Sequence, residues 1–310
     1  MLIKVYENYR SNTEKYNFLT KEKISITKEL DNFDEAIFDT VGYEVREDNK
    51  IEIIEEWVPD VKVFTGFVHK PVKNISVLSN KTTIECRSER AIMKKRKALN
   101  QRTKNDDVSA VVNELLADYT SDSRSTSIGL SWNVEIEYEH GDEYESILDE
   151  ICLQLWWYRD VSEWVLIMDY ILWEDKTNGS KKTTIIFSKK YGDNVKNIKI
   201  AGQSTRANVI IWKDRDGNVH ISQDLSEWYI YGVEEFNFRN GGLVEKTNKM
   251  LERLNIRQRV LLIELEDDIW LSVNIGDKLN VELSNIEDVE DINTEVLVTK
   301  KQIEYEYGEK

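Results

Sequence analysis

Residues 108–119 read VSAVVNELLADY, and this stretch decides how the chain is divided. Its apolar residues recur every three or four positions, the spacing that places them on one face of an α-helix. These residues are Val108, Val111, Val112, Leu115, Leu116 and Tyr119. Asp106 and Asp107 precede the stretch, and either carboxylate is suited to cap the first turn. We therefore expect an amphipathic helix here.

The hundred residues before this helix alternate with the two-residue period of β-strands. Residues 23–27 and 81–87 alternate apolar and polar side chains, and 51–54 and 61–68 are further strand candidates. The runs are short and are bounded by Asn, Asp and Gly, as in a barrel or sandwich. Residues 1–100 are therefore expected to form a small β-barrel.

A second helix is expected after Gly141. Its apolar face consists of Tyr144, Ile147, Leu148, Ile151 and Leu155. Residues 132–138 and 165–173 read as strands, one before this helix and one after it. This succession of helices and strands predicts an α+β insert at residues 101–178.

Strand-like alternation returns after the insert. Residues 260–266, 269–273 and 278–283 are expected as strands, and 242–257 as the one helix of this part. We expect strands from 180–215 to complete the first barrel and 216–310 to form a second one. The predicted fold is α+β and mainly β, with two small β-barrels flanking an α+β insert.

The composition limits the classes of function. Asp and Glu number 58 against 42 Lys and Arg, giving a formal charge of −16. Such a surface repels nucleic acid, although plain solubility explains it equally well. Cys86 and Cys152 are too few for a disulfide framework or zinc site and are expected as buried free thiols. No apolar run approaches the ~20 residues of a membrane span.

A basic segment interrupts the acidic chain at residues 87–104. It lacks the interleaved aromatic residues of a nucleic-acid site. Two interpretations stay open: a solvated helix face, or contact with an acidic strip, such as 282–295, of a neighbouring subunit. The candidate contact residues are Arg90, Lys94, Lys95, Arg96 and Lys97.

Asp214, Asp216 and Asn218 have the spacing that begins a calcium loop. Leu225 stands at the twelfth position, where an EF-hand needs Glu, so a hairpin turn is favoured and calcium stays a minor alternative.

No catalytic residue, cofactor site or metal site is assigned. The carboxylates Glu135, Glu137 and Glu139 share one face of a strand, which more often is a solvated face than a catalytic pair. The histidines are separated along the chain, at His69, His140 and His220. Trp156, Trp157 and Trp164 suggest sugar stacking, but their place at a helix end favours core packing. Nucleophile-elbow, Walker and HExxH motifs are absent from the sequence.

Five segments, taken in order, resemble the phage tail hub family. Residues 63–68 (VFTGFV) are similar to its Phe-x-Gly-x-Ile/Val strand. Residues 83–88 (TIECRS) are similar to a strand that leads into a basic segment, with Ser88 in place of the usual acid. The helix at 108–119 followed by that at 143–151, the strands at 197–200 and 207–210, and the Gly-Asp hairpin at 275–279 complete the resemblance.

The resemblance implies a homotrimer whose two similar barrels per subunit build a ring of six at the distal end of the tail tube. Its neighbours would be the tail tube or distal tail ring protein and a spike, fibre or tape-measure protein. DNA would pass through the lumen without specific binding. The implied location is the virion tail tip or baseplate, assembled in the host cytoplasm, and the implied role is not enzymatic. A distal tail ring protein and a tail-tip wall hydrolase or glycan-binding module remain alternatives.

Overall fold

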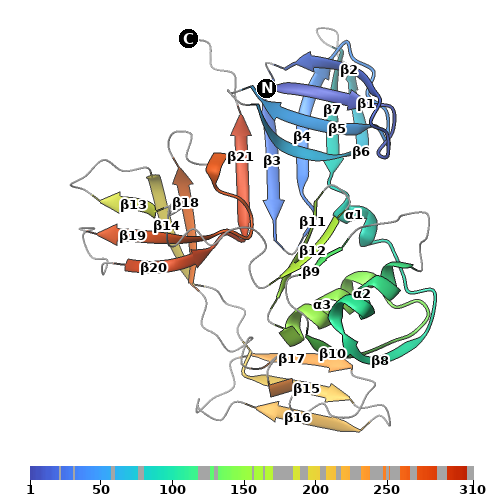
Figure 1. Ribbon diagram of the computed structural model, residues 1–310. Helices are drawn as coiled ribbons and strands as arrows, with labels where there is room; N and C mark the ends of the chain where they lie inside the picture. Colours follow the sequence, from blue (N-terminus) through green and yellow to red (C-terminus); the bar gives the residue numbers. More distant parts are fainter. Residues whose placement is uncertain are drawn as a thin grey trace.

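The structure is a computed structural model, and most of the chain is described in it. The described residues are 1–20, 22–30, 32–56, 60–75, 80–117, 126–128, 132–155, 157–162, 165–169, 184–188, 195–202, 207–213, 218–223, 232–237, 247–248, 251, 259–265, 271–284 and 292–305. Figure 1 shows a large sheet formed mainly by the N-terminal part, a helical insert beside it, and smaller sheets formed by the later residues. The fold is mainly β, as predicted.

The largest sheet has eight strands in the order β2-β1-β5-β6-β7-β4-β3-β21. Their bounds are β1 Leu2–Tyr6, β2 Glu14–Leu19, β3 Ile24–Glu29, β4 Glu35–Val41, β5 Lys50–Glu55, β6 Val61–Ile75, β7 Asn80–Arg87 and β21 Lys300–Tyr305. All neighbouring pairs are antiparallel. This alternation puts Ile24 and Ile26 on the buried face of the sheet.

The sheet curls around a single core. Buried residues from all eight strands form one cluster, including Phe18 of β2 and Ile303 of β21. Tyr43, just after β4, stacks on Phe18 with ring centroids 4.2 Å apart. Among the described residues, however, no backbone pairing joins the edge strands β2 and β21. The prediction of a closed barrel is therefore not confirmed.

The strand that joins the first sheet late in the chain is β21, not a strand from 180–215. Lys300–Tyr305 pairs with β3, with Ile303 opposite Ile26. In contrast, β13 (Thr184–Ser188), β14 (Val195–Gly202) and β15 (Val209–Lys213) pair in three other sheets. The prediction that 180–215 completes the first sheet was wrong, because strand order depends on pairing between distant segments and not on local alternation.

Gly66 marks a close approach of two strands inside the VFTGFV segment. A Cβ atom on Gly66 would lie 2.4 Å from the carbonyl oxygen of Arg87 and 2.7 Å from the ring of Phe64. Only a residue without a side chain fits here. The glycine therefore lets β6 pass from β5 to β7.

The insert contains the two predicted helices and several short strands. Its bounds are α1 Arg90–Met93, β8 Arg102–Asp107, α2 Val108–Ala117, β9 Thr126–Ile128, β10 Asn133–Tyr138, α3 Tyr144–Leu155, β11 Tyr158–Ser162 and β12 Val165–Asp169. β10 pairs with β8, and β12 lies between β11 and β9. The described elements of this region are thus helices and short strands in alternation.

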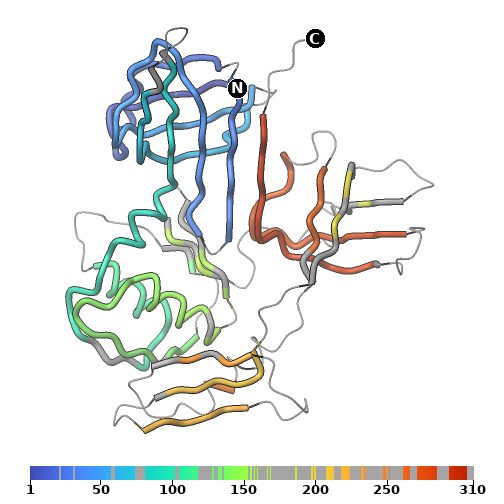
Figure 2. The backbone as a smooth tube through the Cα atoms, turned by 180° about the vertical axis from the view of Figure 1, so that it is seen from behind, coloured from blue at the N-terminus to red at the C-terminus, as the bar shows by residue number. Residues whose placement is uncertain are grey.

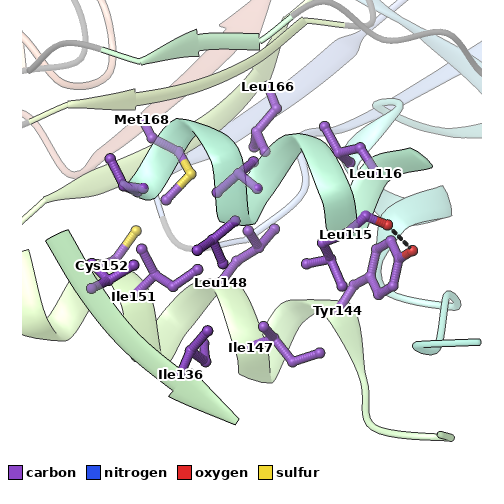
Figure 3. Packing of buried hydrophobic residues seen from close by; sticks show 14 of the residues in the cluster. Leu115, Leu116, Ile136, Tyr144, Ile147, Leu148, Ile151, Cys152, Leu166 and Met168 are labelled. Atoms are coloured by element: carbon purple, nitrogen blue, oxygen red, sulfur yellow. Dashed lines mark hydrogen bonds between the residues drawn. The ribbon is translucent and has the colours of Figure 1, made fainter. Parts of the chain in front are cut away.

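The two long helices of the insert share one core. Figure 3 shows Leu115 and Leu116 of α2 and Ile147, Leu148 and Ile151 of α3 in the same core. The Tyr144 hydroxyl donates to the carbonyl oxygen of Leu115. Tyr119, the last residue of the predicted face of α2, lies outside the described residues.

The first turn of α2 is capped as its sequence suggests. The Asp107 Oδ1 atom accepts a hydrogen bond from the Ser109 amide at 2.9 Å. Cys152 and Trp157 are buried in the core of the insert, and Cys86 is buried in that of the first sheet. Both cysteines are free, as predicted.

The later part of the chain forms three small sheets. Their other strands are β16 Val219–Gln223, β17 Val233–Asn237, β18 Arg259–Leu265, β19 Lys278–Ser284 and β20 Ile292–Leu297. The strand orders are β13-β19-β20, β14-β18 and β16-β15-β17, so a second barrel is not confirmed either.

Leu271 and Ser272 form a 3-10 turn where a strand was predicted at 269–273. Of the predicted helix 242–257, the described residues 247–248 and 251 are helical.

Candidate functional site

The basic segment begins where β7 ends, beside the connection between β3 and β4. The Asp34 amide donates to Ser88 Oγ at 2.9 Å, and the Ser88 amide donates to the carbonyl oxygen of Asp34 at 2.9 Å. Ser88, which departs from the pattern of the family, therefore fixes the start of the segment through its hydroxyl. The short helix α1 follows immediately.

Arg90 points into the molecule and not toward solvent. Its side chain is 1% exposed. Its Nη1 atom donates to the carbonyl oxygen of Leu30 and lies 3.5 Å from the carbonyl oxygen of Arg159. Its Nε atom lies 3.9 Å from Glu145 Oε1. Arg90 is therefore buried within its own chain, where the cation links the first sheet to the insert, and we do not retain it among the residues proposed for contact with a neighbouring subunit.

A second arginine completes this charged cluster. Arg159 of β11 is 3% exposed and forms ion pairs with Glu145 and Asp149 of α3, the latter at 2.6 Å. Burial by itself lowers the pKa of Arg159, but hydrogen bonds and the charges of Glu145 and Asp149 outweigh it and raise the pKa above its ordinary value. Glu145 thus lies between two buried guanidinium groups, and the cluster holds α3 against β11 and α1.

Phe33 of the β3–β4 connection is flanked by two further cations of the basic segment. The guanidinium of Arg87 lies 4.8 Å from the ring centroid, and the Lys94 ammonium lies 5.0 Å from it. Lys94 also donates to Asn32 Oδ1 at 2.7 Å. The side chain of Lys94 is therefore engaged within its own chain.

The other candidate contact residues differ in exposure. Lys95 and Lys97 are exposed, whereas Arg96 is half-buried. The Arg96 carbonyl oxygen accepts a hydrogen bond from the Tyr144 amide at 3.1 Å, and Lys97 forms an isolated β-bridge with Glu143. Of the five residues, Lys95 and Lys97 present the most accessible charge.

Leu30 is the point where three parts of the chain meet. Its carbonyl oxygen accepts from Arg90 of α1, and its amide donates to the carbonyl oxygen of Thr299, just before β21, at 2.8 Å. Its side chain packs against Ile275 of the later part of the chain. Figure 2, seen from behind, shows β21 between the first sheet and the C-terminal sheets. We call Leu30 and these contacts the Leu30 junction.

The sequence did not identify this junction. Arg90 was assigned to the surface because it lies in a run of cations, and Glu145 looked like one acid of many. Arg159 carries a detectable signal: it is the one Lys or Arg between Arg124 and Lys176. A lone cation within an acidic stretch is a candidate for a buried ion pair.

The acidic strip proposed as the partner of the basic segment is only partly described. Glu282 lies on β19, and Glu295 on β20 forms an ion pair with Lys278 of its own chain. Residues 285–291 lie outside the described residues.

The remaining candidate sites gain no geometric support. Asp214 and Asp216 lie outside the described residues, while β15 and β16 pair as the predicted hairpin around them. The ring of His220 stacks on that of Trp212, with the two centroids 4.1 Å apart. Trp157 is buried, and Trp156 and Trp164 lie outside the described residues. Within the described ranges, no group of three or more metal-ligating side chains is found, and no helix is long and apolar enough to cross a membrane.

Comparison with known proteins was informative only at the level of three-dimensional structure. No family model matches the sequence, and no curated protein matches it. A tail protein from Neisseria meningitidis is similar over 98% of this chain and 90% of its own, with a TM-score of 0.65 and 13% identity. The 43 kDa tail protein of prophage MuSo2 from Shewanella oneidensis is similar over 98% and 94%, with a TM-score of 0.65 and 14% identity.

A secretion-system protein has the same fold. This E. coli component of the type VI secretion system is described as similar to the T4 bacteriophage tail proteins gp27 and gp5. It matches over 92% of this chain and 69% of its own, with a TM-score of 0.54 and 7% identity. The chain therefore has the fold of phage tail proteins, and the resemblance to the tail hub family is confirmed in its fold.

Proposed function

We propose that this chain is a structural subunit of a phage or phage-like tail, the hub that closes the distal end of the tube and connects it to a spike or fibre. The observation that carries the proposal is the similarity over 98% of the chain to tail proteins, which leaves little of this chain for an added catalytic domain. We place the chain at the tail tip or baseplate, where its role is in assembly and not in catalysis.

The proposed assembly is a homotrimer. The similar E. coli protein is a component of the type VI secretion system described as similar to the T4 tail proteins gp27 and gp5, which supports a place in a tail-like assembly. Negative-stain images of the purified assembly test this proposal. Threefold class averages are expected, whereas sixfold averages would identify a distal tail ring protein. Clearing of peptidoglycan in a zymogram would instead favour a wall hydrolase.

Lys95 and Lys97 are the residues that we propose for contact with an acidic neighbour. Both are exposed, whereas Arg90 is buried and Lys94 is half-buried. Because each exposed ion pair contributes only about 0.2–1 kcal/mol, apolar contacts must supply most of the association. Their charge therefore affects specificity and orientation more than total affinity.

The double variant Lys95→Glu with Lys97→Glu tests this contact. It should weaken assembly, and more strongly at low salt, where repulsion is least screened. The pair Lys70→Glu with Lys73→Glu, on exposed positions of β6, introduces the same charge change elsewhere. Equal assembly of both double variants in size-exclusion chromatography would remove the role of Lys95 and Lys97 but not the structural role of the chain.

A further inference from the structure

β21 is an edge strand, and among the described residues its backbone pairs with β3 alone. Ile303 is 8% exposed and Tyr305 packs against the same core, while Lys300 and Glu304 form ion pairs with Glu29 and Lys23. Lys301 Nζ donates to the carbonyl oxygen of Val273 at 2.7 Å. Edge strands with one partner open more readily than central strands. The contacts at the start of β21 therefore help to keep this strand paired with β3.

One of those contacts is shared with the insert. The Leu30 amide donates to Thr299, next to β21, while the carbonyl oxygen of the same residue accepts from Arg90. Arg90 also forms an ion pair with Glu145, with Nε 3.9 Å from Oε1. If Glu145 moved away, the buried guanidinium would lose a countercharge and would have to shift toward another partner or solvent. Such a shift would move Leu30, which also holds the strand.

We propose that the Leu30 junction couples the position of α3 in the insert to the attachment of β21 to the first sheet. Displacement of Glu145 releases Arg90, Arg90 shifts Leu30, and β21 loosens from β3. Lys95 and Lys97 lie within four residues of the end of α1, so a partner bound there would act next to the same short helix. The coupling goes beyond the proposed role in a tail and does not depend on it.

Hydrogen–deuterium exchange of the peptide that covers 300–305 measures the coupling. In Arg90→Met, exchange at these amides is expected to rise about tenfold, which corresponds to about 1.4 kcal/mol. Glu145→Gln should produce a smaller rise in the same direction. Glu145→Gln is the more specific test of the coupling, because Glu145 lies on α3 and forms ion pairs with Arg90 and Arg159. It also tests the coupling if Arg90→Met does not fold.

Ile151→Val is the matched control. Ile151 is buried in the core of the insert, in the same helix as Glu145. This variant should speed exchange in α3 and leave residues 300–305 unchanged. The coupling is wrong if Ile151→Val loosens β21 as much as Glu145→Gln does, or if Glu145→Gln leaves β21 unchanged.

Coupling between two sites is reciprocal, which gives a second test. Ile303→Ala removes a buried side chain of β21 and should weaken the attachment of this strand to β3. It should speed exchange in α1 and β11, where Arg90 and Arg159 lie, and leave β16 unchanged. Unchanged exchange in α1 and β11, with β21 demonstrably loosened, would contradict the proposal.

Discussion

At the scale of single residues, burial decides which charges and glycines matter. Arg90 and Lys95 are five positions apart in the same basic segment, yet one is buried between backbone carbonyls and a carboxylate and the other faces solvent. Sequence gives both the same charge. Their surroundings, which distant segments supply, give them different energetic roles.

Replacing Arg90 with Met should lower the free energy of unfolding by about 2–3 kcal/mol, because the change removes buried charge-assisted hydrogen bonds and leaves carbonyl groups without their donor. Lys95→Met, the matched control, should change it by less than about 0.5 kcal/mol. Urea unfolding followed by tryptophan fluorescence checks both values. Equal effects of the two substitutions would show that Arg90 is not buried as described.

Replacing Gly66 with Ala should cost about 1–3 kcal/mol, because the new Cβ atom meets the backbone of β7 and one strand must shift. Thr65→Ala, on the adjacent half-buried position, serves as a control and should cost less. The measurement is the shift of the thermal midpoint of each variant. A Gly66→Ala protein as stable as the parent would mean that β6 and β7 lie farther apart.

The lowered pKa of Glu52 should make the stability of the fold depend on pH. Burial raises the pKa of this carboxyl, but the hydrogen bond from Tyr6 and the charges of Lys50 and Lys62 outweigh burial and lower it. A lowered pKa in the folded state stabilises the fold above the pKa of the unfolded chain, and this contribution is lost as pH falls through the folded value. The Glu52→Gln variant should therefore lose less stability than the parent between about pH 6 and pH 3. Urea unfolding of each protein at both pH values measures the two losses. An identical loss in both proteins would contradict the assignment.

At the scale of elements, local period identified α2, α3 and many strands, whereas pairing between distant segments could not be predicted. The apolar faces of α2 and α3 follow from their spacing alone, because each helix buries one side. β21 was not among the predicted strands, and nothing in its residues indicates that β3, near the opposite end of the chain, is its partner. The cluster of Arg90 with Glu145 was missed for the same reason.

The N-cap of α2 provides a test at this scale. Asp107 accepts the Ser109 amide, so Asp107→Ala should lower stability by about 0.5–2 kcal/mol. Asp106 Oδ1 accepts instead from the Asp107 amide, at the end of β8, and Asp106→Ala should cost less. Chemical denaturation of the two variants separates them. A larger effect at Asp106 would mean that the helix begins one residue earlier.

At the scale of the whole molecule, the charge of −16 must be reconciled with association between copies. Like-charged subunits repel, so apolar contacts and local pairs of opposite sign have to offset the repulsion. We propose that the acidic surplus lines the channel of the assembly. DNA carries one negative charge per ~1.7 Å of duplex, and an acidic wall would let it pass without being held. A neutral or basic channel would contradict this part of the account alone.

The most direct test of the central claim is a cryo-EM reconstruction of the particle that contains this chain. The account predicts three copies around the axis at the distal end of the tail tube, with a spike or fibre beyond them. The map should also place Lys95 and Lys97 at a boundary between copies or with a neighbouring tail protein. A ring of six copies, or a position away from the end of the tube, would contradict the proposed hub.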